Sequence, residues 1–466
     1  MKKSLDIPKI CECIWDLEKK HNLLHKEISG IKVWQSLRVP IYHKICMESG
    51  IFSQLHSSRE SIVDVLKRFY YIYNVIFKDP LRGNHHKDIL VFDHPRKIEV
   101  KGRYIDIYTD HLLRDSDDKD YDVIESVYLG RHLSKFERNR LYLDAFSVGS
   151  LRASLKKVPF TPDELEFIES LRAEIFEMLK VDMNLRKMFS KEIRHFKYGL
   201  SYYDKLIKKR KPKRIYLVVG YSFYKKPLIA AAKKNGVETV ELQHGTIGKY
   251  HLAYSFPGEK PSSLDYFPDR FYSFGKYWSD ITEIPLAKDK IEFYGFPYFS
   301  EQKERFASVK KLKMQILFIS QGAIGKDLSS IAYAFAEKMP DYRVVYKLHP
   351  GEYDRWKHDY EDLVKASALP NFRVVDNNRV ELYQYLAESE YLAGVFSTAL
   401  YEGLAFGCKT VIIDLPGAEY MEALIDKGIV RSAGSSDELS NIIKEPFSRK
   451  FDRDYFFAEG FKKLKM

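Results

Sequence analysis

The sequence predicts an α/β protein built from two Rossmann-like domains, and three observations support this fold class. Short apolar runs alternate with helical stretches in two parts of the chain, which is typical of buried parallel strands joined by helices. Several runs end in a small polar cluster, as at 315–322 (QILFISQG). The length of 466 residues also exceeds that of one typical hydrophobic core.

This division gives four segments. We expect a helical N-terminal extension over 1–85, a first Rossmann-like domain over 86–300 and a second over 314–445. A tail over 446–466 is expected to pack back on the first domain. The polar and basic stretch 303–313 is expected to link the two domains.

The N-terminal extension shows helical periodicity. One expected helix has an apolar face made of Trp34, Leu37, Ile41 and Ile45. Arg38 lies in the same helix, and we expect it to form a buried salt bridge to the next domain. Residues 61–77 predict another amphipathic helix with a basic side.

The first domain begins with an apolar strand that leads into Asp93. Further strands are expected at 105–113 and 121–129, and the last ones at 269–278 and 290–297. Residues 161–208 predict helices with one apolar face made of Leu171, Ile175, Met178 and Leu179. Residues 214–242 predict a strand–helix–strand unit. Its helix is marked by Pro227 near the start and by Gly236 after the end, which are the residues expected at helix boundaries.

The second domain contains the polar clusters that predict a ligand site. One strand runs into a His-Pro pair and another into a Ser-Thr pair that opens a helix, and ligands of such sheets bind at the carboxyl ends of strands. We expect the two clusters to lie at neighbouring strand ends and to hold the phosphate of a nucleotide, aided by the helix start. Taken singly, Ser-Thr is equally an ordinary helix cap and His-Pro a loop, and Lys347 either joins the site or points away from it. The predicted donor-binding residues are Gln321, Gly322, Lys347, His349, Pro350, Ser397, Thr398 and Glu402.

A second cluster lies in the first domain, where a strand ends in Gln243-His244-Gly245. A histidine suits proton transfer near neutral pH. His244 is therefore the first candidate for a general base and Asp93 the second, and His349 is expected to stabilise the leaving phosphate. We expect Gln243, Gly245 and His251 on the acceptor side, while a turn histidine that only shapes the loop remains the alternative for His244.

Composition limits the partners and the compartment. The net charge of +11 and pI near 9.0 favour an anionic partner. No nucleic acid is expected, because the basic residues are dispersed rather than grouped with aromatic residues in a recognisable module. The four cysteines have neither disulfide nor zinc spacing, so free thiols in a reducing compartment are expected. The chain has no signal-peptide pattern and no apolar run long enough to cross a bilayer, so we expect a cytoplasmic protein with at most a peripheral contact to an anionic membrane.

The order of these motifs resembles that of GT-B enzymes of bacterial surface polysaccharides. His349-Pro350 and Ser397-Thr398 resemble motifs of the CMP-sugar sialyl- and Kdo transferases. His244-Gly245 together with His349-Pro350 is similar to the histidine pair of the CDP-glycerol glycerophosphotransferases. The Gln-His-Gly, the Pro-Asp at 268–269 and the Phe-Gly-x-x-Trp at 274–278 resemble capsule and O-antigen proteins. The resemblance covers roughly 210–430.

The resemblance implies a glycosyltransferase with a GT-B-like fold. A sugar would pass from a nucleotide-sugar, with CMP- or CDP-linked donors favoured, to a capsule, O-antigen or lipopolysaccharide acceptor, either a glycan or a lipid-linked glycan. Inverting, metal-independent transfer without a cofactor is expected. Asp115-Ser116-Asp117 matches the metal-binding DxD pattern, but its run of acids favours a solvated loop. The alternatives are a CDP-polyol phosphotransferase, a sugar-nucleotide 2-epimerase and a non-catalytic nucleic-acid binder.

Overall fold

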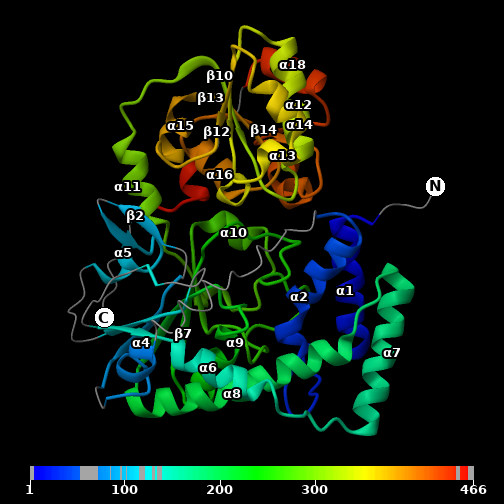
Figure 1. Ribbon diagram of the computed structural model, residues 1–466, viewed down its shortest axis with the longest axis vertical. Coiled ribbons are helices and arrows are strands. Elements are labelled where there is room, and N and C mark those ends of the chain that lie inside the picture. Colours follow the sequence, from blue (N-terminus) through cyan, green and yellow to red (C-terminus); the bar gives the residue numbers. More distant parts are fainter. Residues whose placement is uncertain are drawn as a thin grey trace.

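The protein consists of two stacked lobes with a helical region beside the first lobe (Figure 1). The structure is a computed structural model and describes residues 5–52, 72–83, 86–94, 97–100, 102–114, 121–127, 132–133, 139–447 and 452–459. Each lobe contains a fully parallel sheet, of seven strands in the first and six in the second. The predicted α/β class with two Rossmann-like domains is confirmed.

The first sheet has its topological switch between β1 and β6, where the strand order reverses. The order is β5-β4-β1-β6-β7-β8-β9, and every pair is parallel. In such sheets the crevice at the switch point is where ligands bind. The strands are β1 Ile89–Phe92, β4 Tyr121–Glu125, β5 Arg140–Tyr142, β6 Arg214–Val218, β7 Glu238–Leu242, β8 Arg270–Ser273 and β9 Ile291–Phe293, and β2 Ile98–Val100 pairs antiparallel with β3 Arg103–Ile105 outside the sheet.

Helices cover this sheet and form the N-terminal region. A long helix, α8, packs on α6 and α9 and also touches α2 and α7, so it joins the extension to the first domain. The helices of this lobe are α1 Ile7–His21, α2 Trp34–Glu48, α4 Ile72–Phe77, α5 Asp110–Leu113, α6 Asp144–Ala153, α7 Pro162–Leu179, α8 Leu185–Arg210, α9 Lys225–Lys234, α10 Lys276–Asp280 and α11 Pro297–Arg305, with a 3-10 turn, η2, at Lys288–Lys290.

The second sheet has the order β12-β11-β10-β13-β14-β15 and is also fully parallel. Its strands are β10 Leu312–Ile319, β11 Arg343–Lys347, β12 Phe372–Val375, β13 Ser389–Gly394, β14 Lys409–Ile413 and β15 Arg431–Ala433. Its helices are α12 Gly325–Lys338, α13 Trp356–Asp359, α14 Glu361–Ala366, α15 Leu382–Glu388, α16 Thr398–Ala405, α17 Glu422–Asp426 and α18 Ser436–Lys444, with 3-10 turns η3 Pro350–Glu352, η4 Ala418–Met421 and, in the tail, η5 Arg453–Tyr455.

This strand order corrects one prediction about the ligand site. The His-Pro cluster follows β11 and the Ser-Thr cluster follows β13, but β10 lies between these two strands. The clusters are therefore not at neighbouring strand ends. The site spans three strands, and the end of β10 at 320–322 forms its middle.

Four local predictions also differ from the structure. The segment 105–113 leaves the strand conformation after Ile105, because Asp106 accepts the Tyr108 N–H (3.0 Å) and so turns the chain into α5. Met178 is exposed, unlike the three residues predicted to share its face. Arg38 forms its buried salt bridge with Glu18 of the extension itself and reaches the first domain through the Leu252 carbonyl (2.5 Å). The loop between the domains is shorter than predicted, because α11 runs to Arg305 and β10 begins at Leu312.

The described part of the tail lies in the joint between the lobes. Trp278 of α10 donates from Nε1 to the Phe456 carbonyl (2.8 Å), and the Ala458 N–H donates to the Phe274 carbonyl (2.7 Å). Tyr401 of α16 packs on both Trp278 and Phe456. The second domain and the tail therefore contact the first domain through one shared aromatic cluster.

The cysteines and the lengths of the helices bear on the composition-based predictions. All four cysteines are buried and free. Within the described ranges, every helix is too short or too polar to cross a bilayer. The predicted helix at 61–77 falls mostly outside the described residues, apart from α4.

Candidate functional site

A buried glutamate holds the ends of β10 and β11 together in the second domain. Glu352 is completely buried, and its Oε1 accepts from Ser320 Oγ (2.9 Å) and from Tyr360 Oη (2.8 Å). Its Oε2 accepts from the backbone N–H of His349 (2.7 Å). Burial raises the pKa of this carboxyl above its usual range. The glutamate thus fixes the turn on which His349 lies.

The His-Pro turn presents its residues to solvent. His349 and Pro350 are exposed, and His349 Nδ1 accepts from the Gly351 N–H (3.1 Å). Because Nδ1 is the acceptor, the neutral imidazole carries its proton on Nε2. This tautomer leaves the imidazole with a donor group, which is what binding of a phosphate oxygen requires.

Lys347 lies inside this strand-end cluster. Its Nζ donates to Tyr353 Oη (2.5 Å) and to Asn378 Oδ1 (3.3 Å), and the side chain is buried. Burial lowers the pKa of Lys347 to about 8, so the amine is largely protonated at neutral pH. A buried cation at this edge favours an anion nearby.

The end of β10 contributes a loop with an unused acceptor. Gln321 is half-buried, and its Oε1 has no hydrogen-bond partner within the described part of the chain. The neighbouring Gly322 carbonyl accepts from an Arg355 guanidinium nitrogen (3.2 Å). A buried acceptor without a partner is expensive, so a ligand that donates to Gln321 would relieve this cost.

The Ser-Thr pair begins α16 as predicted. Ser397 is the N-cap, and its Oγ accepts from the Ala399 N–H (3.2 Å). Glu402 follows one turn later and is buried, and burial raises its pKa to about 8. This carboxyl is therefore largely protonated at neutral pH and offers a donor as well as an acceptor.

The histidine of the first-domain cluster lies among hydroxyl groups. His244 follows β7, with Tyr221 Oη 3.4 Å from its Nε2 and Tyr254 Oη 3.4 Å from its Nδ1. The imidazole of His94 lies nearby, with ring centroids 6.2 Å apart. Burial holds the pKa of His244 well below its usual range, and the neighbouring His94 and His251 lower it further. His244 is thus neutral at pH 7 and can accept a proton.

The next two residues, Gln243 and His251, were predicted to lie on the acceptor side. Gln243 is buried, and its side chain bonds the Gly245 carbonyl (2.8 Å), Ser273 Oγ (3.1 Å) and the Phe274 N–H (2.8 Å). It therefore shapes the loop and does not face an acceptor. His251 is half-buried, its Nδ1 lacks a hydrogen-bond partner among the described residues, and burial lowers its pKa to about 4.

Asp93, the second candidate base, is enclosed by cations. It is buried at the end of β1, where its Oδ2 pairs with Lys97 and with Arg140 Nη1 (2.8 Å). Lys97 and Arg140 also pair with Glu125. The prediction of Asp93 as a base is disfavoured, because an ion-paired carboxylate with no exposed surface cannot reach an acceptor hydroxyl.

The two domains bring their polar clusters face to face. A Cβ atom built on Gly245 would lie 3.8 Å from Thr398 Oγ1. The loop carrying His244 therefore meets the start of α16 directly. The backbone of His244 is also held by the first domain, because Tyr108 Oη donates to the His244 carbonyl (2.8 Å). The site thus lies between the lobes, at the carboxyl ends of both sheets (Figure 1).

Several residues of this site were missed by the sequence analysis. Tyr221 and Tyr254 lie around His244, and Glu241 of β7 accepts from Tyr254 Oη (2.6 Å) and from the Gly220 N–H (2.8 Å). Glu352 had a usable signal, because a glutamate three residues after a turn-initiating residue is a capping pattern. The tyrosines had none, since nothing in their spacing points to a common site.

Residues 115–117, which match the DxD pattern but were predicted to form a solvated loop, lie outside the described residues. Within the described ranges, no group of three or more His, Cys, Asp or Glu side chains is arranged to hold a metal ion. Metal-independent chemistry therefore stays a prediction.

Comparisons with known proteins find similarity at the level of three-dimensional structure. No protein-family model matches the chain, and no curated protein matches its sequence. A UDP-GlcNAc 2-epimerase from Methanocaldococcus jannaschii is 10% identical, with a TM-score of 0.47, over 80% of this chain and 96% of that chain. A UDP-GlcNAc 2-epimerase from Neisseria meningitidis is 12% identical, with a TM-score of 0.44, over 76% and 90%. The wall teichoic acid polymerase TagF is 10% identical, with a TM-score of 0.40, over 83% and 89%. At this level of similarity, function has to be argued from the residues of this chain.

Proposed function

We propose that the chain is a glycosyltransferase that moves a sugar from a nucleotide-sugar, with a cytidine donor favoured, to a bacterial surface glycan. Capsule, O-antigen and lipopolysaccharide are the acceptor classes in view, free or lipid-linked. The observation that carries the proposal is the approach of Gly245 to Thr398. This approach supports the proposal, because the loop that carries the neutral His244 then faces the start of α16, which we assign to the phosphate.

The donor half of the proposed reaction uses the second domain. The leaving phosphate is held by His349 and by the start of α16 at Ser397-Thr398, with Lys347 supplying positive charge nearby. Glu402, protonated at neutral pH, donates to or accepts from a ribose hydroxyl. Donors that are already oriented before reaction are usually the largest contribution to stabilising developing charge.

The acceptor half uses His244. The acceptor oxygen attacks the anomeric carbon, its proton passes to the His244 imidazole, and the bond from carbon to phosphate oxygen breaks with its electron pair on the phosphate. A positioned base contributes typically about 10²- to 10⁴-fold to such a step. The low pKa of His244 keeps the imidazole unprotonated before the reaction.

A panel of nucleotides tests the donor site. CMP, CDP, UDP, GDP and ADP are added to the purified full chain, and thermal unfolding is followed. A ligand at one hundred times its Kd stabilises the folded state by about 2.7 kcal/mol. A selective shift by CMP or CDP that His349→Ala removes is expected, whereas a chain that responds to none of the five nucleotides would contradict the proposal.

Product analysis then separates the related activities. A glycosyltransferase yields free nucleotide and a glycosylated acceptor. A polyol phosphotransferase yields a phosphodiester, and a 2-epimerase yields only an altered donor. We expect the first outcome, with no added metal or cofactor.

A further inference from the structure

One side of the first domain exposes an apolar helix face far from the proposed active-site residues in sequence. Val148, Leu151 and Leu155 follow one another at helical spacing along α6 and the turn after it. Their exposed fractions are 46%, 66% and 85%. Two leucines this open to water carry a free-energy cost unless something covers them.

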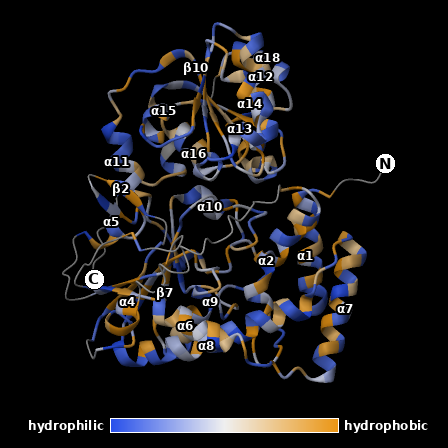
Figure 2. Cartoon of the chain, viewed as in Figure 1, coloured by the Kyte–Doolittle hydropathy of each residue, from blue (hydrophilic) through white to orange (hydrophobic). Residues whose placement is uncertain are grey.

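The helix α4 extends this apolar surface. It packs against α6, and its Ile72, Tyr73 and Phe77 are at least half exposed. Figure 2 shows hydrophobic colouring on both helices at the edge of the first lobe. The surface therefore spans two elements and is larger than a single exposed side chain.

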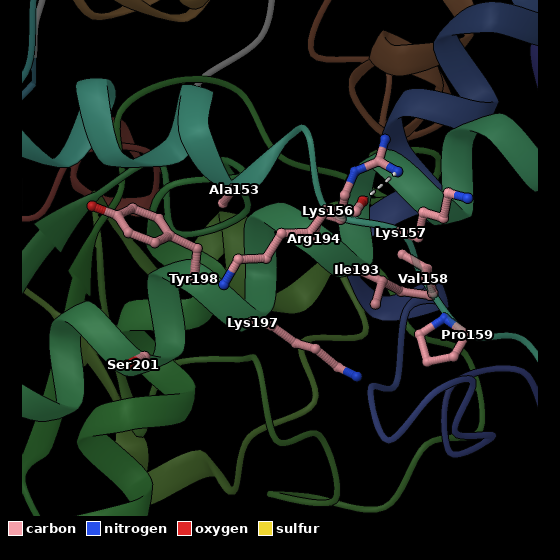
Figure 3. A pocket seen from close by; sticks show the side chains of 10 residues that line it. All are labelled: Ala153, Lys156, Lys157, Val158, Pro159, Ile193, Arg194, Lys197, Tyr198 and Ser201. Atoms are coloured by element: carbon pink, nitrogen blue, oxygen red, sulfur yellow. Dashed lines mark hydrogen bonds between the residues drawn. The ribbon is translucent and has the colours of Figure 1, made fainter.

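A basic hollow of about 280 Å³ lies at the C-terminal end of α6, and Ala153 and Lys156 of its lining flank Leu155 in the sequence. It lies between the turn after α6 and the middle of α8, and its lining includes Lys156, Lys157, Arg194 and Lys197 (Figure 3). Arg194 Nη1 donates to the Lys156 carbonyl (3.3 Å), which ties the turn to α8. Four cationic residues thus belong to the lining of one recess.

Acidic residues are scarce around this recess. The sequence from 145 to 160 has three cations and no acid. On the adjoining part of α8, Glu192 is buried and Lys191 and Lys197 are exposed. The lining of the recess therefore carries an excess of positive charge, which favours an anionic partner.

We propose that this surface, formed by α6, the turn at 154–159 and α8, docks the protein on an anionic phospholipid bilayer. Leu151 and Leu155 insert among the acyl chains near the interface, and the basic hollow takes a lipid headgroup phosphate. Exposed leucines beside lysines are the combination that interfacial helices use. A soluble anion would occupy the hollow but would leave the leucines in water, so the membrane accounts for both features.

Vesicle binding by the full chain tests the proposal without donor or acceptor, so its outcome is independent of the proposed glycosyl transfer. Sedimentation is measured with vesicles of phosphatidylcholine alone and with vesicles containing phosphatidylglycerol. We expect binding only to the anionic vesicles, weakened by salt because screening shortens the reach of surface charges.

Two variants and two controls locate the surface. Leu155→Ser is expected to lower the partition coefficient about tenfold, the effect of leaving one leucine uninserted. Lys156→Gln with Lys157→Gln is expected to lower it roughly twenty-fivefold, at about fivefold per lysine. The controls remove exposed residues of the second domain and of the loop before it, Val364→Ser and Lys310→Gln with Lys313→Gln, and should bind as the wild type does.

Clear results would overturn the proposal. Wild-type protein that ignores anionic vesicles, or variants that bind like the controls, would show that this surface does not contact lipid. If glycerol phosphate bound to the purified chain while vesicles did not, the hollow would be a site for a soluble anion and the membrane proposal would be wrong. Because the substituted side chains are exposed, thermal unfolding of all variants is expected to match that of the wild type.

Discussion

Glu352 is the residue whose removal should disturb the candidate donor site most. Its buried carboxyl accepts from three groups on three segments, Ser320 Oγ, Tyr360 Oη and the His349 N–H, at 2.7 to 2.9 Å. Glu352→Ala removes all three acceptor contacts and leaves the donors in a site that water reaches poorly. Glu352→Gln keeps the shape and alters only the donor and acceptor pattern.

The magnitude follows from counting these bonds. A lost hydrogen bond costs about 1 kcal/mol net, and more where the donor stays buried and unpaired. Three of them give about 3–4 kcal/mol for Glu352→Ala. In Glu352→Gln the amide oxygen can still accept from the His349 N–H, and the amide nitrogen can donate to the two hydroxyls once they rotate, so about 1 kcal/mol is expected.

Hydrogen–deuterium exchange of residues 343–366 measures this local stability, because a two-domain chain does not unfold in one two-state step. A loss of 3 kcal/mol would speed exchange of the protected amides about a hundredfold. Glu438 provides a matched control, since it accepts one exposed backbone N–H from Gly434 (2.8 Å). If Glu352→Ala exchanged no faster than Glu438→Ala, Glu352 would not hold the His349 turn.

Three further predictions concern the candidate site and its pH dependence. His349→Ala should leave the fold intact, because the side chain is exposed, but weaken nucleotide binding by about 10- to 100-fold, the value of one charge-assisted bond. His244→Ala should keep nucleotide affinity and lose turnover. Calorimetry measures the nucleotide affinity of both variants, and product assays measure their turnover. His195 is buried and neutral, with a pKa lowered to about 4. As pH falls below 6.5, this histidine is protonated in the unfolded chain before it is protonated in the folded chain, so about 3 kcal/mol of stability is lost by pH 4. The stability of His195→Asn should therefore fall less steeply with decreasing pH than that of the wild type. Glu402 has a pKa raised to about 8, so this buried carboxyl lowers the stability of the fold increasingly as pH rises from 4.5 to 8. Glu402→Gln should therefore be thermally more stable than the wild type at pH 8 and match it near pH 5.

The fold was predictable because its strands are buried on both faces. Such strands appear in sequence as continuous apolar runs, and β1, β6, β10 and β13 all contain such a run. The order of strands in the sheet was not predictable in the same way. Nothing in the sequence from 312 to 413 states that β10 lies between β11 and β13, because pairing depends on contacts between segments distant along the chain.

The candidate site was predicted in part for the same reason. Strand ends are visible in sequence, so His349, Ser397 and His244 were found. The role of each side chain depends on partners that only the fold supplies. Asp93 looked available until Arg140, 47 residues away, was found on its carboxylate, and Gln243 looked exposed until Ser273 and Phe274 were found to occupy its side chain.

The joint between the lobes explains why the two polar clusters stay in register. Tyr401 lies on α16, three residues after Thr398, and its ring packs on Trp278 of the first domain with centroids 4.5 Å apart. Phe456 of the tail closes this cluster, and its carbonyl lies 2.6 Å from where a Cβ on Gly275 would stand. A domain rotation that separated Thr398 from the His244 loop would therefore have to part Tyr401 from Trp278. Separation of the two polar clusters is thus coupled to the aromatic joint, to which the tail contributes Phe456.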